Sequence, residues 1–84
     1  MFTKKAFGQR LRQLRKEHNE YQDTLADLLE VSTAQISEME NGKKGTTLER
    51  LVTLCRHYNV SADYLLGLSD TPSNPVISNQ SEDW

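Results

Sequence analysis

Two short helical runs separated by only three residues constrain this chain more than any other feature. Residues 22–29 and 33–41 each carry apolar side chains at steps of three and four, which is typical of amphipathic helices. Ala26 stands where the two helices cross closely, and Val31 and Ile36 are spaced to fill the wedge between them. Ser32 is a favourable N-cap for the second helix. We therefore expect a tightly packed helix pair joined by a sharp turn.

Three further helices are predicted around this pair. Apolar residues recur at helical spacing over 5–18 and 48–58, and a last short helix begins at residue 61 and stops before Gly67. Residues suited to ending a helix follow the first, third and fourth helices: Asn19, Gly42 and Asn59. Strand-like alternation is absent from the sequence, so the fold class is all-α with five helices.

The length of 84 residues leaves room for a single domain, which we place at 1–68. Residues 69–84 are rich in Ser, Asn, Pro and acidic side chains, and we read them as a flexible acidic tail. The formal net charge of −2 is partly a property of this tail, because residues 1–67 sum to +1. DNA-binding domains are usually more basic than this, so any DNA contact must come from locally gathered cations or from dimerisation.

Several functional classes receive no support from the composition. No apolar run approaches the length of a membrane span, and the N-terminus lacks the apolar stretch of a secretory signal, so we expect the cytoplasm. The single Cys55 is expected to act as a buried small hydrophobe. His18 and His57 are far apart in the sequence without ligand-like spacing, so we expect no metal site, and no cofactor or small-molecule site is evident. Catalytic motifs are also absent, and we expect no enzyme.

The predicted helix pair has one well-attested use. In a helix-turn-helix the first helix lies across the DNA backbone and the second enters the major groove. With Ile36 and Met39 facing inward, the outward side of the second helix is polar or small. Its outward residues are Thr33, Ala34, Ser37 and Glu38, with Gln35 near the edge.

Four separate pieces of the sequence, in order, resemble the phage-repressor and Cro family, also called the xenobiotic-response-element (XRE) type. The pieces are LRQLRKEHN, QDTLADLLEVSTAQISEMENGKK, TLERLVTLCRHYNVS and ADYLLGLSD. They lie within residues 7–70, which is most of the chain. The resemblance implies a lambda-repressor-like fold, with the helix-turn-helix at about 22–41. It also implies a transcriptional regulator that binds double-stranded DNA, expected to be a repressor on a palindromic operator.

The resemblance also assigns roles to individual residues. Gln22 would hydrogen-bond a phosphate, and Arg15 and Glu40 occupy the positions of a structural ion pair. The residues implied to face base edges are Thr33, Ala34, Ser37 and Glu38, and we add Gln35 to them. The residues implied to hold the DNA backbone are Asn41, Lys43 and Lys44, although the two lysines would otherwise be an ordinary solvated pair.

The chain departs from the family pattern at three places. Glu30 stands in the turn where Gly is common, which predicts a slightly strained left-handed residue. Glu20 and Tyr21 replace the usual apolar residue and Ser or Thr, so Tyr21 would take over packing while Asn19 or Glu20 supplies the cap. Glu38 puts a carboxylate in the reading surface, where it either accepts a hydrogen bond from cytosine N4 or pairs with a neighbouring Lys.

A domain of this size reads only half of a two-fold site, which favours a homodimer on DNA. The apolar residues expected at its interface are Tyr64, Leu65, Leu66 and Leu68, which could alternatively serve only to close the monomer core. An alternative function also stays open, namely a helical protein-interaction module, antitoxin-like or anti-regulator-like, whose reading helix does not touch DNA. The acidic balance and Glu38 keep this alternative open.

Overall fold

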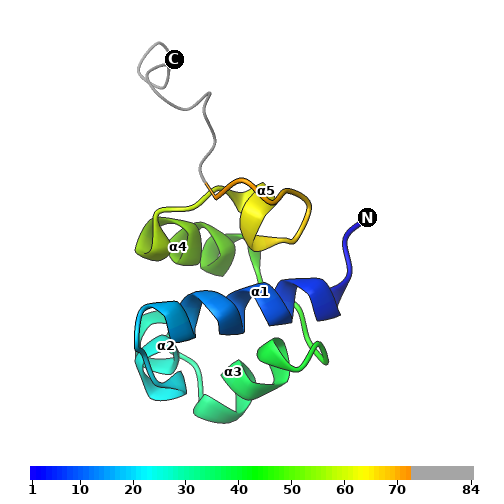
Figure 1. The fold of residues 1–84 in the computed structure, drawn as a ribbon. Coiled ribbons are helices and arrows are strands. Elements are labelled where there is room, and N and C mark those ends of the chain that lie inside the picture. The colour runs from blue at the N-terminus through cyan, green and yellow to red at the C-terminus, as the bar shows by residue number, and fades with distance from the viewer. Residues whose placement is uncertain (73–84) are drawn as a thin grey trace.

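The computed structural model describes residues 1–72, and the secondary structure in this range is entirely helical. The helices are α1 (Lys4–Glu17), α2 (Gln22–Leu29), α3 (Thr33–Glu40), α4 (Leu48–Tyr58) and α5 (Ala62–Leu65). In Figure 1, α1 runs through the middle, with α2 and α3 on one side and α4 and α5 on the other. The five-helix, all-α prediction is confirmed. None of the helices in residues 1–72 combines the length and apolar character needed to cross a membrane.

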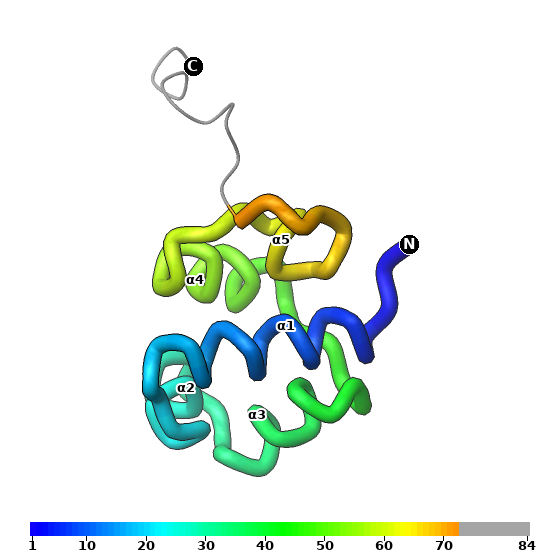
Figure 2. Tube along the Cα trace, in the orientation of Figure 1, coloured from blue at the N-terminus to red at the C-terminus, as the bar shows by residue number. Residues whose placement is uncertain are grey.

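Local hydrogen bonds explain where the helices begin and end. The side chains of Thr3, Ser32, Thr47 and Ser61 each accept a hydrogen bond from the backbone N–H three residues later. The predicted terminators also behave as expected, with φ angles of 56° at Asn19, 78° at Gly42 and 56° at Asn59. The tube in Figure 2 follows the resulting sharp reversals between successive helices.

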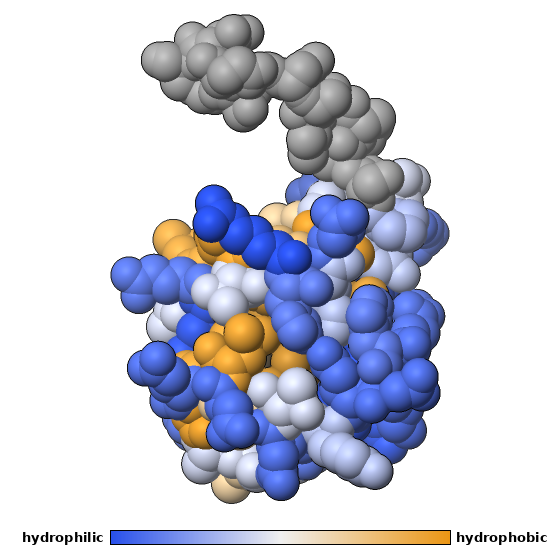
Figure 3. Space-filling view, turned by 90° about the vertical axis from the view of Figure 1, so that its left-hand side faces the viewer, coloured by the Kyte–Doolittle hydropathy of each residue, from blue (hydrophilic) through white to orange (hydrophobic). Residues whose placement is uncertain are grey.

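The core forms where α1 meets the other helices. Its fully buried large side chains come from every helix: Phe7, Leu11, Leu25, Ile36, Leu54 and Leu65. Cys55 is half-buried against this core, and burial raises the pKa of its thiol. The face in Figure 3 is mostly hydrophilic, with apolar patches between the charged side chains. Because Phe7 and Leu11 of α1 share this core with side chains of all the other helices, α1 joins the α2–α3 pair to the α4–α5 pair.

Gly8 allows α1 and α3 to approach until their backbones are in contact. A Cβ built on Gly8 would lie 2.3 Å from the carbonyl oxygen of Met39 and 2.6 Å from that of Glu40. Both distances are far below van der Waals contact, so no other residue fits at this position without moving α3. The C-terminal end of α3 thus rests directly on α1.

A polar cluster ties the end of α4 to the loop before α2. The Glu20 carboxylate accepts a hydrogen bond of 2.6 Å from the Tyr58 hydroxyl, and its other oxygen lies 2.6 Å from His57 Nε2. The rings of His18 and His57 both pack edge-on against Tyr58. Burial raises the pKa of the Tyr58 hydroxyl, and the bond to Glu20 raises it further. His18 and His57, although far apart in the sequence, therefore both contact Tyr58.

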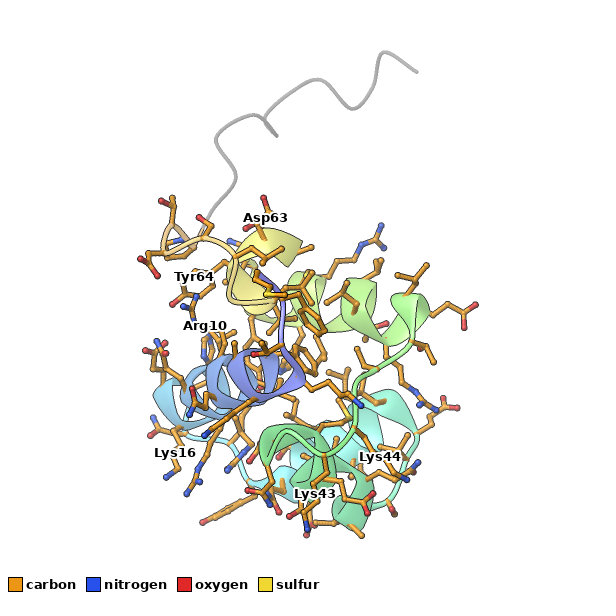
Figure 4. The ribbon with its side chains drawn as sticks, turned by 90° about the vertical axis from the view of Figure 1, so that its right-hand side faces the viewer. Arg10, Lys16, Lys43, Lys44, Asp63 and Tyr64 are labelled. Carbon is orange, nitrogen blue, oxygen red and sulfur yellow. The ribbon has the colours of Figure 1, made fainter. Side chains whose placement is uncertain are left out.

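The chain after α5 contacts Arg10 of α1 and then turns back to the residue before α5. The Arg10 guanidinium stacks 3.9 Å from the centroid of the Tyr64 ring and donates hydrogen bonds to the carbonyl oxygens of Tyr64 and Ser69 (Figure 4). The Ser61 N–H donates to the Pro72 carbonyl oxygen over 2.8 Å. The start of the predicted tail, 69–72, therefore contacts the domain. Residues 73–84 lie outside the described residues, and the boundary at 68 stays a prediction.

The contact at Gly8 predicts a clear effect on stability. Gly8→Ala should destabilise the domain by about 1–3 kcal/mol, because the added methyl group strikes backbone atoms that cannot rotate away. This loss should outweigh the better helix propensity of Ala, about 1 kcal/mol at most. Urea denaturation followed by circular dichroism measures it.

Gly45→Ala is the matched control, since a Cβ at Gly45 meets nothing within 4 Å. An unchanged or higher stability of Gly8→Ala would contradict the close contact.

Candidate nucleic-acid interface

The turn between α2 and α3 has the geometry that the sequence predicted. Glu30 adopts a left-handed conformation, with φ 59° and ψ 46°, and the Val31 N–H donates to the Ala26 carbonyl oxygen over 3.0 Å. A non-Gly residue in this conformation costs about 1 kcal/mol. Ala26 is buried at the crossing, Ile36 is fully buried, and Val31 packs against the core. The two helices are therefore held rigidly together.

The same packing divides α3 into an inner and an outer side. Ile36, Met39 and Glu40 are buried, so the rest of the helix faces outward. The predicted base-reading residues all retain solvent exposure, with Thr33, Ala34 and Gln35 exposed and Ser37 and Glu38 half-buried. Asn41, Lys43 and Lys44 follow at the C-terminal end of α3 and are exposed. The predicted site residues from α3 and the following loop thus lie on or next to one helix surface.

A buried carboxylate connects α3 to both α1 and α2. Glu40 Oε2 accepts a hydrogen bond of 2.6 Å from Arg15 Nε, and Glu40 Oε1 accepts from Arg15 Nη2 and from Gln22 Nε2, both over 3.1 Å. The hydrogen bond to Glu40 raises the pKa of the Arg15 guanidinium. The structure thus contains the ion pair that the family resemblance implied. Gln22, the implied phosphate contact, has one amide proton committed to Glu40.

The start of α2 differs from the expectation at Tyr21. Tyr21 occupies the N-cap position without a side-chain capping bond, and its side chain is 80% exposed. The expectation that Tyr21 takes over packing is therefore wrong. Glu20 supplies no cap, because its carboxylate is held by His57 and Tyr58. The backbone donors at the start of α2 consequently receive no cap from the Tyr21 or Glu20 side chain.

Several polar groups on the outer side of α3 already have partners. The Thr33 hydroxyl donates to Asp23 Oδ1 over 2.7 Å, and Asn41 Nδ2 donates to Ser37 Oγ over 3.4 Å. Gln35 Oε1 accepts the Ser32 N–H as part of a capping box, which directs the Gln35 side chain toward the start of its own helix. A Gln that reads adenine presents both its oxygen and its nitrogen to the base, so Gln35 would have to leave the capping box to make that paired contact.

The charges around α3 are mixed. Lys44 Nζ lies 3.4 Å from Glu38 Oε1, so in this structure Glu38 pairs with a lysine. Lys43 and Lys44 lie together beside α3 in Figure 4. Arg50, which the sequence reasoning did not select, lines a hollow next to α3 together with Gln35 and Lys44. The sequence could have pointed to Arg50 through its position three residues after Thr47, the N-cap of α4. That spacing places Arg50 in the first turn of α4, beside the loop that follows α3.

The residues predicted for a dimer interface separate into two pairs. Leu65 is fully buried and Tyr64 is 8% exposed, so both close the core of this chain. Leu66 is half-buried and Leu68 is 46% exposed. Leu66 also lines an apolar groove with Phe2 and Leu48, and Leu48 is 80% exposed. Apolar surface is therefore available here, but Tyr64 and Leu65 contribute little of it.

A short helix laid across a second one, with a polar outer side and a buried inner side, defines a helix-turn-helix domain of the kind found in transcription regulators. A family model described as "Helix-turn-helix" matches residues 11–65. The chain belongs to this helix-turn-helix family, of the Cro/C1 or XRE type.

Individual relatives agree with this assignment. An uncharacterized HTH-type transcriptional regulator of Bacillus subtilis, YobD, is 43% identical over 70 residues, which cover 83% of this chain and 62% of YobD. The chain thus spans about three fifths of that relative. The P22 c2 repressor, solved in complex with a synthetic operator, is 32% identical with a TM-score of 0.69, covering 75% of this chain and 96% of the repressor. The restriction-modification controller C.AhdI of Aeromonas hydrophila is 29% identical with a TM-score of 0.65, covering 74% and 94%.

The Glu40 network predicts unequal effects for two glutamates of α3. Glu40→Ala should destabilise the domain by about 3–5 kcal/mol, because it leaves the Arg15 guanidinium without a carboxylate to balance its charge in a largely buried site. Thermal or urea denaturation measures the loss.

Glu38→Ala is the control, since it removes a half-buried carboxylate whose ion pair with the exposed Lys44 is worth about 0–1 kcal/mol. Equal losses in the two variants would mean that the buried pair contributes no more than a surface pair.

Proposed function

We propose that this chain is a sequence-specific DNA-binding regulator, a repressor that reads a palindromic operator in the major groove through α3. The observation that carries the proposal is the outer side of α3, where small and polar side chains are exposed while Ile36, Met39 and Glu40 hold the helix in place. A helix presented in this way fits the width of the major groove. We infer that the chain acts by binding and carries out no catalysis.

The roles that we propose follow from position and chemistry. Gln22, at the start of α2, and Asn41, Lys43 and Lys44, after α3, contact phosphates on either side of the groove. Ala34 presents a methyl group suited to a thymine methyl, and Ser37 accepts or donates at a base edge. Thr33, Gln35 and Glu38 supply the other base contacts. Glu38 would exchange Lys44 for a cytosine amino group, leaving Lys44 for a phosphate.

Bulk charge contributes little to the proposed binding. Residues 22–41 hold four carboxylates with exposed or half-buried side chains and no lysine or arginine: Asp23, Asp27, Glu30 and Glu38. Phosphate attraction therefore depends on Lys43, Lys44 and Arg50 at one end of α3. Few neutralised phosphates give a shallow salt dependence for one domain. A dimer would double these contacts.

We further propose that the regulator binds DNA as a two-fold homodimer. A single reading helix covers half of a site, and successive half-sites are about 34 Å apart. The surface that we propose for the interface includes Leu66 and Leu68, extended by the groove that Phe2 and Leu48 form with Leu66. A second copy would cover this apolar surface, which is built from the first residues of the chain, the start of α4 and the end of α5.

Binding of duplex DNA tests the main proposal. Lys43→Ala should weaken binding uniformly across sequences and reduce the slope of log affinity against log salt by about 0.9, the value for one released phosphate contact. Arg56→Ala removes the same charge from the last turn of α4, across α1 from α3, and should leave the slope unchanged. Fluorescence anisotropy over a salt series measures both. An absence of duplex binding at low salt would favour the protein-interaction module instead.

The mass in solution tests the dimer. Sedimentation equilibrium of the full chain should give a dimer, and Leu48→Glu should shift it toward the monomer by placing a charge in the apolar groove. Tyr21→Glu is the matched control, because Leu48 and Tyr21 are both 80% exposed and only Leu48 lies in the groove. A monomeric wild-type chain, or equal dissociation of both variants, would contradict this interface.

A further inference from the structure

One hydrogen bond on the reading surface links its two helices. Thr33 is the first residue of α3, and its hydroxyl lies 2.7 Å from Oδ1 of Asp23, in the first turn of α2. An ionised carboxylate only accepts hydrogen bonds, whereas a hydroxyl has one proton to donate. The Thr33 proton must therefore point at Asp23. Thr33 Oγ1 keeps its lone pairs for another partner.

Because the Thr33 hydroxyl donates its proton to Asp23, it can recognise fewer base atoms than a free hydroxyl. A free hydroxyl rotates to suit its partner, so it accepts from a base amino group or donates to a base oxygen or nitrogen. A hydroxyl whose proton is held by a carboxylate can only accept. In the major groove the hydrogen-bond donors are the amino groups of adenine (N6) and cytosine (N4), while guanine and thymine present acceptors.

We propose that Asp23 is a specificity-determining residue that restricts Thr33 to adenine or cytosine. The inference rests on the proposed DNA-binding function and adds the chemistry of one base contact. Asp23 acts through Thr33 and not by touching DNA, because its carboxylate is engaged by the Thr33 hydroxyl. Opposite guanine or thymine, Thr33 Oγ1 would face another acceptor without a proton between them.

Two features of the fold favour persistence of this bond in a complex. The α2–α3 pair is fixed by Ala26, Ile36 and the Glu40 network, so the backbones of Asp23 and Thr33 remain at a separation that lets their side chains meet. Asp23 also lies in the first turn of α2, where the free backbone N–H groups of the helix end attract an acidic side chain and hold it near α3. Exclusion of water from the interface then makes the loss of the bond more costly than in the free protein.

Selection from a random duplex pool tests the proposal with four full-length proteins: wild type, Thr33→Val, Asp23→Ala and Asp27→Ala. Thr33→Val removes the hydroxyl at nearly constant shape, so the base position whose preference it changes is the one that Thr33 contacts. The wild type should prefer adenine or cytosine there by about tenfold, the value of one well-formed hydrogen bond. Asp23→Ala should lose this preference and accept guanine or thymine.

Asp27→Ala is the matched control, because it removes the same charge from an exposed position of the same helix. Both aspartate variants should bind all duplexes somewhat more tightly, and only Asp23→Ala should change the base preference. Replacing the preferred base by an analogue that lacks its amino group should cost the wild type about tenfold and Thr33→Val nothing.

Three results would overturn the inference: a wild-type preference for guanine or thymine at that position, identical base preferences in the two aspartate variants, or no change in Thr33→Val. A wild-type chain that enriches no sequence would instead overturn the proposed function. The two failures are therefore distinguishable. Circular dichroism of each variant establishes that it is folded.

Discussion

The buried carboxylate of Glu40 is the interaction on which the rest of this structure depends. It accepts hydrogen bonds from Arg15 on α1 and from Gln22 on α2, so one side chain of α3 fixes its orientation against both neighbours. A buried charge is costly unless it is paired and hydrogen-bonded, and here both conditions are met. The orientation of the short helix α3 is set by these directional polar bonds at one end together with the packing of Ile36 and Met39 in the core.

Polar side chains around α3 hold one another before any partner is present. The Thr33 hydroxyl donates a hydrogen bond to Asp23, the Ser32 backbone N–H donates to the Gln35 side chain, and Lys44 forms an ion pair with Glu38. Such contacts reduce the conformational freedom that a bound surface would otherwise have to lose. They also restrict what each group can offer to a partner. The chemistry of the surface therefore depends on pairs of residues more than on the exposed side chains taken singly.

Most of the fold could be predicted because its signals are local. Apolar spacing gave the helices, and hydroxyl or asparagine side chains marked ends such as Ser32 and Asn59. The Arg15–Glu40 pair could be expected only through the family resemblance, since the two residues are 25 positions apart. The partners of Glu20 could not be predicted, because nothing near Glu20 in the sequence points to His57 and Tyr58 on α4. The Asp23–Thr33 bond was missed for the same reason, since it depends on the angle between two helices.

The approach of α1 to α3 at Gly8 has a geometric consequence. The contact is between backbone atoms, and Gly42 lies against the Lys5 backbone in the same way. Side chains can shift by rotating, but backbone carbonyls in a helix cannot. The depth of the molecule from the reading helix to α1 is therefore a fixed length. In a two-fold assembly of the proposed kind, substitutions on the outer side of α3 could therefore alter which bases are read without altering the distance of the reading helix from α1.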